Sequence, residues 1–189
     1  LVRRRMSELP ITVLRPGIVV GDSKTGEVGR MEGISLLILL MLNAAPDRPM
    51  PLPVRSGIPL SIVPIDHVVR AGRHIAADPR ARGRTFHIID SDPLTAERVF
   101  ELLARSVGRK IPKTFLPPFL ASRLMRLPGI QPGGSQPLPH AFLDQIGTEV
   151  VYDDGGAKMI LAGTGIACPP FESFVEAMVR YVREHELGA

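Results

Sequence analysis

The sequence predicts an α/β fold, with an incomplete parallel sheet and a mainly helical second part. Two short apolar runs, Ile11–Leu14 and Arg84–Ile89, lack the polar–apolar alternation of a half-exposed strand. This pattern is typical of strands that are covered on both faces in a parallel sheet. Segments with helical periodicity follow both runs, and strands that alternate with helices favour an α/β fold. Because two or three strands make a poor sheet, we expect further strands outside this sequence.

The first half of the chain should contain a strand, a polar loop, a helix, a Pro-rich stretch, a short strand and a second helix. Pro16 lacks the N–H that a central strand needs, so the first strand should end near Arg15, with residues 16–20 as its exit. Asp66 should begin the second helix, where its carboxylate faces the positive helix end. The expected ranges, in order, are Ile11–Leu14, Gly21–Gly29, Met31–Asn43, Pro46–Pro53, Leu60–Val63 and Asp66–Asp78.

The second half should contain the strand Arg84–Ile89 and two clear helices. Thr95 is a good N-cap for the first of these helices, and Gly108 ends it. A Pro/Gly-rich stretch over residues 111–136 follows, with a short helix near 120–127. The last helix begins after Pro169 and Pro170, and its apolar residues share one face: Phe171, Phe174, Val175, Met178 and Val182.

Composition excludes several classes of protein. The 189 residues are 44 % hydrophobic and 22 % charged, which excludes a disordered chain. The net charge is +4, but the Arg residues are scattered and aromatic residues make up only 5 %, so we expect no nucleic-acid partner. The longest apolar stretch, Ile34–Leu42, is too short to span a bilayer. With one Cys no intrachain disulfide can form, and we expect a cytoplasmic protein.

No catalytic or metal-binding constellation stands by itself in the sequence. The five His residues are dispersed, and His67 and His74 share a helix face without a third ligand nearby, so no metal is expected. Cys168 lacks a Cys-x-x-Cys partner and is interpreted as a buried structural thiol. The Ser residues lack the Gly-x-Ser-x-Gly context of a nucleophile elbow.

The segment Arg15-Pro16-Gly17-Ile18-Val19 is the strongest candidate for a binding site. Ligands of open α/β sheets bind outside the carboxyl ends of the strands, which is where this segment is expected. Pro16 withdraws the backbone from the ladder, and Gly17 allows another group to approach closely. The backbone groups of residues 17–19 would then be free to hold a planar amide such as a nicotinamide carboxamide. A Pro-Gly turn without any ligand remains an equal alternative.

Four pieces of the sequence together resemble a known family. They are residues 14–26 (LRPGIVVGDSKTG), 62–71 (IVPIDHVVRA), 83–90 (GRTFHIID) and the following helix, which begins at Thr95 and ends at Gly108. In order and spacing they resemble the carboxyl-terminal half of an extended short-chain dehydrogenase/reductase. Gly-Asp-Ser-x-Thr-Gly favours the branch of thioester reductases and male-sterility-type fatty acyl reductases. These enzymes use NAD or NADP, so NADP or NAD is the cofactor that the resemblance implies for the full-length protein.

The resemblance also implies a domain organisation. Residues 1–22 and 60–92 would be the carboxyl-terminal elements of a Rossmann-like domain, and residues 23–59 and 93–189 a substrate-binding lobe. The family's Gly-rich fingerprint and its Tyr-x-x-x-Lys pair are absent, since Gly156 follows Tyr152 and His185 follows Tyr181 at the Lys position. No catalytic residue is therefore assigned in this chain, and the isolated chain is expected to be inactive.

The site residues follow from matching this sequence to the family. Pro16, Gly17, Ile18 and Val19 would line the nicotinamide end of the cofactor site. Gly21, Asp22, Ser23 and Thr25 would contact substrate, and Phe115–Gln136 would help to shape the pocket. Leu60 stands where many relatives that act on nucleotide sugars carry an Arg, and Arg55 is the nearest upstream cation. A lipophilic carbonyl, alcohol or acyl thioester is therefore expected as substrate, either as a small molecule or as a carrier-linked acyl chain.

Three other interpretations stay open at this point. The chain could be a non-catalytic binding or scaffold module with the same fold, or part of a nucleotide-sugar epimerase or dehydratase. Ile34–Leu42 could bind a membrane surface, although its Leu residues also suit an ordinary buried helix. The resemblance also allows a homodimer.

Overall fold

The computed structural model describes residues 2–5, 8–43, 57–109 and 150–186, and it confirms the α/β fold class. The predicted Pro-rich stretch 46–53, the short helix near 120–127, Arg55 and the segment Phe115–Gln136 lie outside the described residues. The strands are β1 (Val13–Pro16), β2 (Ile18–Val20), β3 (Ile62–Pro64) and β4 (Thr85–Ile88). The α-helices are α1 (Val2–Arg5), α2 (Ile34–Asn43), α3 (Ile65–Ala77), α4 (Ala96–Ser106), α7 (Gly155–Leu161) and α8 (Val175–Glu186). Short 3₁₀ turns are η1 (Pro79–Ala81) and η2 (Phe171–Ser173).

The strands form two parallel pairs. β1 pairs with β4 from Val13 opposite Thr85 to Pro16 opposite Ile88. β2 pairs with β3 from Ile18 opposite Ile62 to Val20 opposite Pro64. The predicted parallel relation between the first strand and the strand near residues 84–89 is therefore confirmed. Within the described part of the chain each sheet consists of these two strands.

The expectation that the first strand ends before Pro16 is wrong. Pro16 is the last residue of β1, and its exit is itself the strand β2. In a parallel ladder alternate residues direct their backbone groups to the same neighbour, so a Pro at the other positions loses no hydrogen bond to it. The N–H of Gly17 donates to the Ile88 oxygen at 3.0 Å, and the N–H of Ile18 donates to the Ser61 oxygen at 2.8 Å. The chain thus changes partner strand at Gly17.

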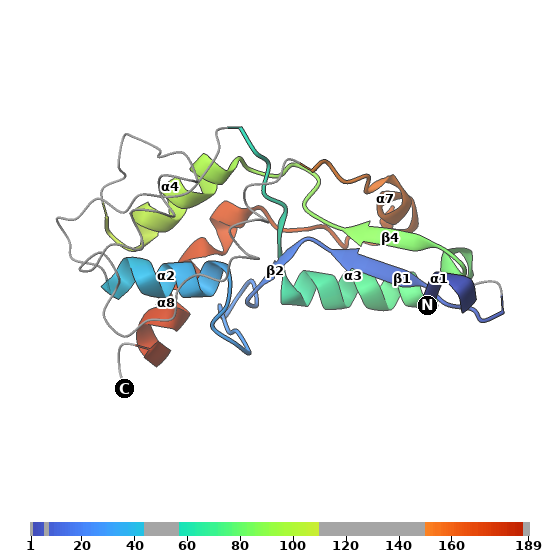
Figure 1. Cartoon of the computed structure of the whole chain (residues 1–189), viewed down its shortest axis with the longest axis horizontal. Helices are drawn as coiled ribbons and strands as arrows, with labels where there is room; N and C mark the ends of the chain where they lie inside the picture. Colours follow the sequence, from blue (N-terminus) through green and yellow to red (C-terminus); the bar gives the residue numbers. More distant parts are fainter. Residues whose placement is uncertain (1, 6–7, 44–56, 110–149, 187–189) are drawn as a thin grey trace.

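The larger hydrophobic core lies at one end of the molecule, where α2, α4 and α8 pack together (left in Figure 1). Six apolar residues of α2 are buried, and so are Phe100 of α4 and Met178 of α8. The interpretation of the apolar run as an ordinary buried helix is confirmed. No helix among the described residues has the length and apolar character needed to cross a membrane.

The smaller core lies at the other end, where α3 and α7 pack against β1 and β4 (right in Figure 1). Phe86 and Ile88 of β4 are buried against Ile75 of α3 and Ile160 of α7. α7 falls in the range predicted for the substrate lobe, yet its buried side chains belong to this core. The division into two domains by residue ranges stays a prediction.

Local sequence signals explain the helix boundaries. α2 begins at Ile34 rather than at Met31, because Gly33 has φ of +55° and a helix cannot pass through that conformation. The Thr95 side chain accepts a hydrogen bond from the Arg98 N–H at 3.4 Å, and Gly108, with φ of +78°, follows α4, as predicted. The last helix begins at Val175 rather than directly after Pro170, because the 3₁₀ turn η2 comes first, but all five of the predicted apolar residues are buried.

Candidate functional site at the strand junction

The junction at Gly17 is organised by Ser61. The Ser61 carbonyl accepts the Ile18 N–H, and its hydroxyl accepts the Asp90 N–H at 2.9 Å. A Cβ on residue 17 would lie 2.5 Å from the Ser61 oxygen, so the close approach of the two strands requires glycine. Ser61 therefore ties the carboxyl ends of β1 and β4 to the start of β3. Ligands of α/β proteins bind at such carboxyl ends.

The backbone groups that point away from the paired strands at this junction suit a planar amide. The N–H groups of Gly17 and Ile18 are already hydrogen bonded, so they are not free as the sequence analysis expected. In the parallel pairs the Pro16 carbonyl is directed away from β4, and the N–H and carbonyl of Val19 are directed away from β3. Val19 is 42 % exposed. Pro16 and Val19 thus offer two hydrogen-bond acceptors and one donor, which complement the NH₂ group and the carbonyl oxygen of a carboxamide.

An aromatic residue from a distant segment stands beside the junction. Tyr152 lines a cavity of about 130 Å³ together with Pro16, Gly17, Ile18 and Ser61. Its ring lies 5.3 Å from the ring of His87, at 44°. Neither Tyr152 nor Ser61 was singled out by the sequence analysis as a binding residue. No local motif marks them, because only the fold brings residues this far apart together.

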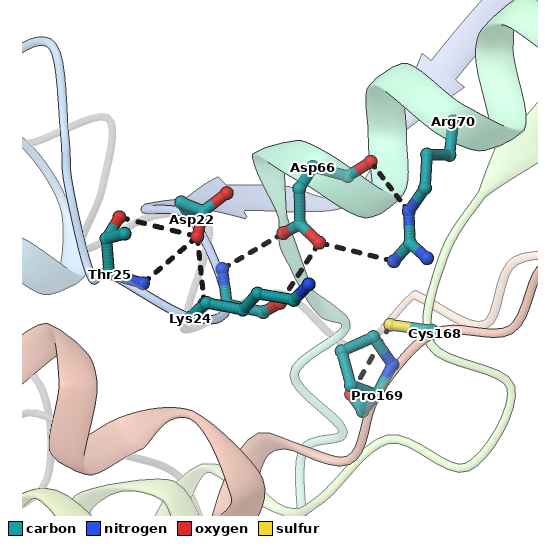
Figure 2. A network of polar contacts seen from close by, with 8 residues as sticks. Asp22, Lys24, Thr25, Asp66, Arg70, Cys168 and Pro169 are labelled. Atoms are coloured by element: carbon teal, nitrogen blue, oxygen red, sulfur yellow. Dashed lines mark hydrogen bonds and ion pairs between the residues drawn. The ribbon is translucent and has the colours of Figure 1, made fainter.

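The predicted substrate loop is held in shape by hydrogen bonds between its own residues. Oδ1 of Asp22 accepts hydrogen bonds from the N–H groups of Lys24 at 2.8 Å and of Thr25 at 3.0 Å (Figure 2). The backbone N–H groups of Thr25 and Lys24 hold the pKa of the Asp22 carboxyl below its usual range. The Thr25 hydroxyl in turn accepts the Glu27 N–H at 3.2 Å. Asp22 and Thr25 therefore maintain the shape of the loop.

The same loop contacts α3 on one side and α8 on the other. Oδ1 of Asp66 accepts the Ser23 N–H and Oδ2 accepts the Ser23 hydroxyl, each at 3.0 Å, and Arg70 pairs with Oδ2 at 3.2 Å (Figure 2). On the other side, a Cβ on Gly26 would collide with the backbone of Ala177 in α8. From the sequence, Asp66 was expected only to begin a helix. Its position as the first polar residue after β3 was the available signal for this second role.

The remaining sequence candidates are placed as follows. The cofactor candidates Pro16–Val19 include the first two residues of β2, and the substrate candidates begin at Gly21, directly after the strand ends. Gly21 is buried, and a Cβ on it would lie 2.5 Å from the Gly26 oxygen.

The Cys168 thiol donates to the Pro169 oxygen at 3.6 Å, and burial raises its pKa to about 12. Among the described residues no three His, Cys, Asp or Glu side chains are placed to hold a metal ion.

Comparison with known proteins finds a family match in the first part of the chain, a similar curated protein and a similar fold. Residues 1–72 match the NAD-binding family model described as male sterility protein. An aldehyde reductase of Aspergillus flavus, lnbA, is 30 % identical over 115 residues, which is 59 % of this chain and 11 % of that protein. The terminal R domain from the myxalamid PKS-NRPS biosynthetic pathway shares the fold, with a TM-score of 0.72 and 24 % identity over 99 % of this chain and 47 % of that one. The family match thus covers the first 72 residues, and the chain as a whole shares the fold of that R domain.

A second solved structure with the same fold is an epimerase. UDP-glucuronic acid 4-epimerase from Bacillus cereus, solved in complex with NAD, has a TM-score of 0.62 and 16 % identity, over 96 % of this chain and 46 % of its own. The chain thus spans about half the length of these two solved proteins and a small share of the curated aldehyde reductase. Within the described residues the paired strands form a partial Rossmann-like sheet.

Proposed function

We propose that this chain forms part of an NAD(P)-dependent reductase that acts on a lipophilic carbonyl compound or an acyl thioester, with the nicotinamide carboxamide held at the strand junction. The observation that carries the proposal is the set of backbone groups at Pro16 and Val19 that are directed away from the paired strands, beside the close approach of Gly17 to Ser61. The cofactor supplies the hydride when it is bound. The residues of this chain hold and orient the carboxamide.

Two observations favour a lipophilic substrate over a nucleotide sugar. Leu60 is 3 % exposed and belongs to the larger core, so the position that carries an Arg in many sugar-nucleotide enzymes is filled by an apolar group here. A buried Leu neither pairs with nor neutralises a diphosphate. The similarity to an aldehyde reductase and to a terminal R domain supports the same substrate class.

The loop of Gly21–Thr25 is assigned the role of substrate contact in this proposal. The side chains of Asp22, Ser23 and Thr25 hold the loop together, so we assign them to keeping its shape. Lys24 and Thr25 are exposed, and we assign them also to the outer surface of the loop. A carrier-linked acyl chain would reach the junction past this surface.

The proposal is tested on the full-length protein. Oxidation of NADPH and NADH is followed with acyl thioesters and long-chain aldehydes, and the reaction with NAD is followed separately with UDP- and GDP-sugars. We expect turnover of the acyl substrates. Turnover of sugar nucleotides alone would overturn the substrate class, and binding of neither cofactor in titration calorimetry would favour the scaffold module.

Loop variants test the substrate contact. Ser23→Ala removes one of the two hydrogen bonds to Asp66, and we expect KM for the acyl substrate to rise by about fivefold with little change in cofactor affinity. The matched control is Ser173→Ala, which removes an exposed hydroxyl of η2 that donates to the Pro170 oxygen. Equal KM changes in both variants would contradict the role of the loop.

A further inference from the structure

A cavity of about 730 Å³ lies next to the strand junction, beyond the carboxyl end of β4. It is bounded by the segment after β4, by α7 and by the segment that leads into η2. None of the residues from Pro16 to Val19 or from Gly21 to Thr25 lines it. Its volume falls in the range of small-molecule sites, about 300–1,000 Å³. It therefore has room for a ligand that the proposed reductase site does not use.

The charges around this cavity are mainly negative. Asp90, Asp92 and Glu172 line it, and none of the ion pairs among the described residues includes any of the three. Lys158 is the one cationic Lys or Arg among the described lining residues, and Asp154 already pairs with it at 3.0 Å. Burial raises the pKa of the Asp90 carboxyl, and the nearby carboxylates act in the same direction. These carboxylates would gain from a cation in the cavity.

A buried polar group at the cavity also lacks a partner. His67 lines the cavity and is 3 % exposed, and its Nδ1 has no hydrogen-bond partner among the described residues. Burial lowers the pKa of this imidazole, so it is neutral near pH 7 and can accept or donate a hydrogen bond. Buried polar atoms without a partner are uncommon, and a ligand atom is one way to satisfy them.

Apolar side chains form another part of the wall. Ile88, Leu94, Leu161, Ile166 and Phe171 line the cavity. A ligand that fits all of these groups combines an apolar body with a positively charged head. We propose that this cavity binds a small organic amine with an aromatic or aliphatic body, next to the strand junction but outside the carboxamide position at Pro16 to Val19.

Calorimetric titration of the purified protein with tryptamine tests the proposal. The comparison compound is indolepropionate, which replaces the ammonium with a carboxylate on the same indole body. We expect the Kd for tryptamine to be lower by about tenfold or more, because charge-assisted hydrogen bonds contribute that much. Absence of tryptamine binding, or equal affinity for both compounds, would overturn the proposal. The readout is binding alone, so it stands or falls independently of reductase activity.

Three variants locate the binding. Glu172→Gln removes a lining carboxylate and should weaken tryptamine binding by about fivefold, whereas Glu176→Gln on the exposed face of α8 should not change it. Ala162→Trp places a large ring at an exposed lining position and should abolish binding without disturbing the core. Equal effects of the two Glu variants, or full binding by Ala162→Trp, would show that the amine binds elsewhere and would overturn the assignment.

Discussion

The two parallel strand pairs meet at Gly17 but are buried to different degrees. β3 is buried along its whole length, and β2 and β3 contribute to the larger core. β1 is half-buried at Val13 and Leu14 and exposed at Arg15 and Pro16, and its pair with β4 rests on the smaller core. The candidate cofactor groups lie at the boundary between the two. A more deeply buried pair thus supports one side of the junction, and a more accessible pair leaves the other side open to a ligand.

The largest loss of stability is expected when a buried ring is removed from either core, and such variants test whether the two cores unfold separately. Phe100→Ala in the larger core and Phe86→Ala in the smaller core each remove a ring that is 1 % exposed, at a cost of about 3–5 kcal/mol in the free energy of unfolding. Hydrogen exchange should show faster exchange of the β1–β4 amides in Phe86→Ala, with the β2–β3 amides changed less. Equal acceleration of both strand pairs would show that the two cores unfold as one unit.

The junction itself is tested by Gly17→Ala. Because the added methyl group would lie 2.5 Å from the Ser61 oxygen, the strands must separate, and we expect a loss of about 1–3 kcal/mol in denaturant unfolding. The control is Gly29→Ala, where the added methyl group meets no atom within 4 Å. Similar stability of both variants would contradict the close approach that defines the junction.

A smaller loss of stability is expected from a change at the N-cap of α4, and its effect on amide exchange should be confined to the larger core. Thr95→Ala removes the N-cap of α4, and we expect it to lower the free energy of unfolding by about 1 kcal/mol. Thr95→Ser keeps a hydroxyl at the cap and should restore most of this loss. Amide exchange in β1 and β4 is the sharper measurement, since it should not respond to a change in α4. A response there would weaken the contrast between the two regions.

The smallest expected effect is a pH dependence at His67, near the start of α3. Burial, and next the charge of Arg70, lower its pKa from the ordinary value of 6.5, while Asp66 and Asp90 act in the opposite direction. Below pH 6.5 the unfolded state binds a proton that the folded state resists, so stability falls as the pH drops below that value. Unfolding of the wild type between pH 7.5 and 5 is compared with His67→Gln, which should show a shallower decline. Identical slopes would show that His67 is not the group responsible.

Most of the fold could be predicted from the sequence because local signals determine it. The apolar runs near β1 and β4, the cap at Thr95 and the apolar face of the last helix depend on short stretches of chain. The change of partner strand at Gly17 could not be predicted, since it depends on where Ser61 lies in space. For the same reason the roles of Asp66 in the loop and of Tyr152 beside the junction were missed.

The loop between β2 and α2 has a mechanical consequence. Its Ser23 is bound to α3, which belongs to the smaller core, and its Gly26 lies against α8, which belongs to the larger core. A rotation of one core relative to the other would have to stretch or release this loop. The affinity of any molecule for the loop is therefore thermodynamically linked to the angle between the two halves, and each would bias the other to the same extent.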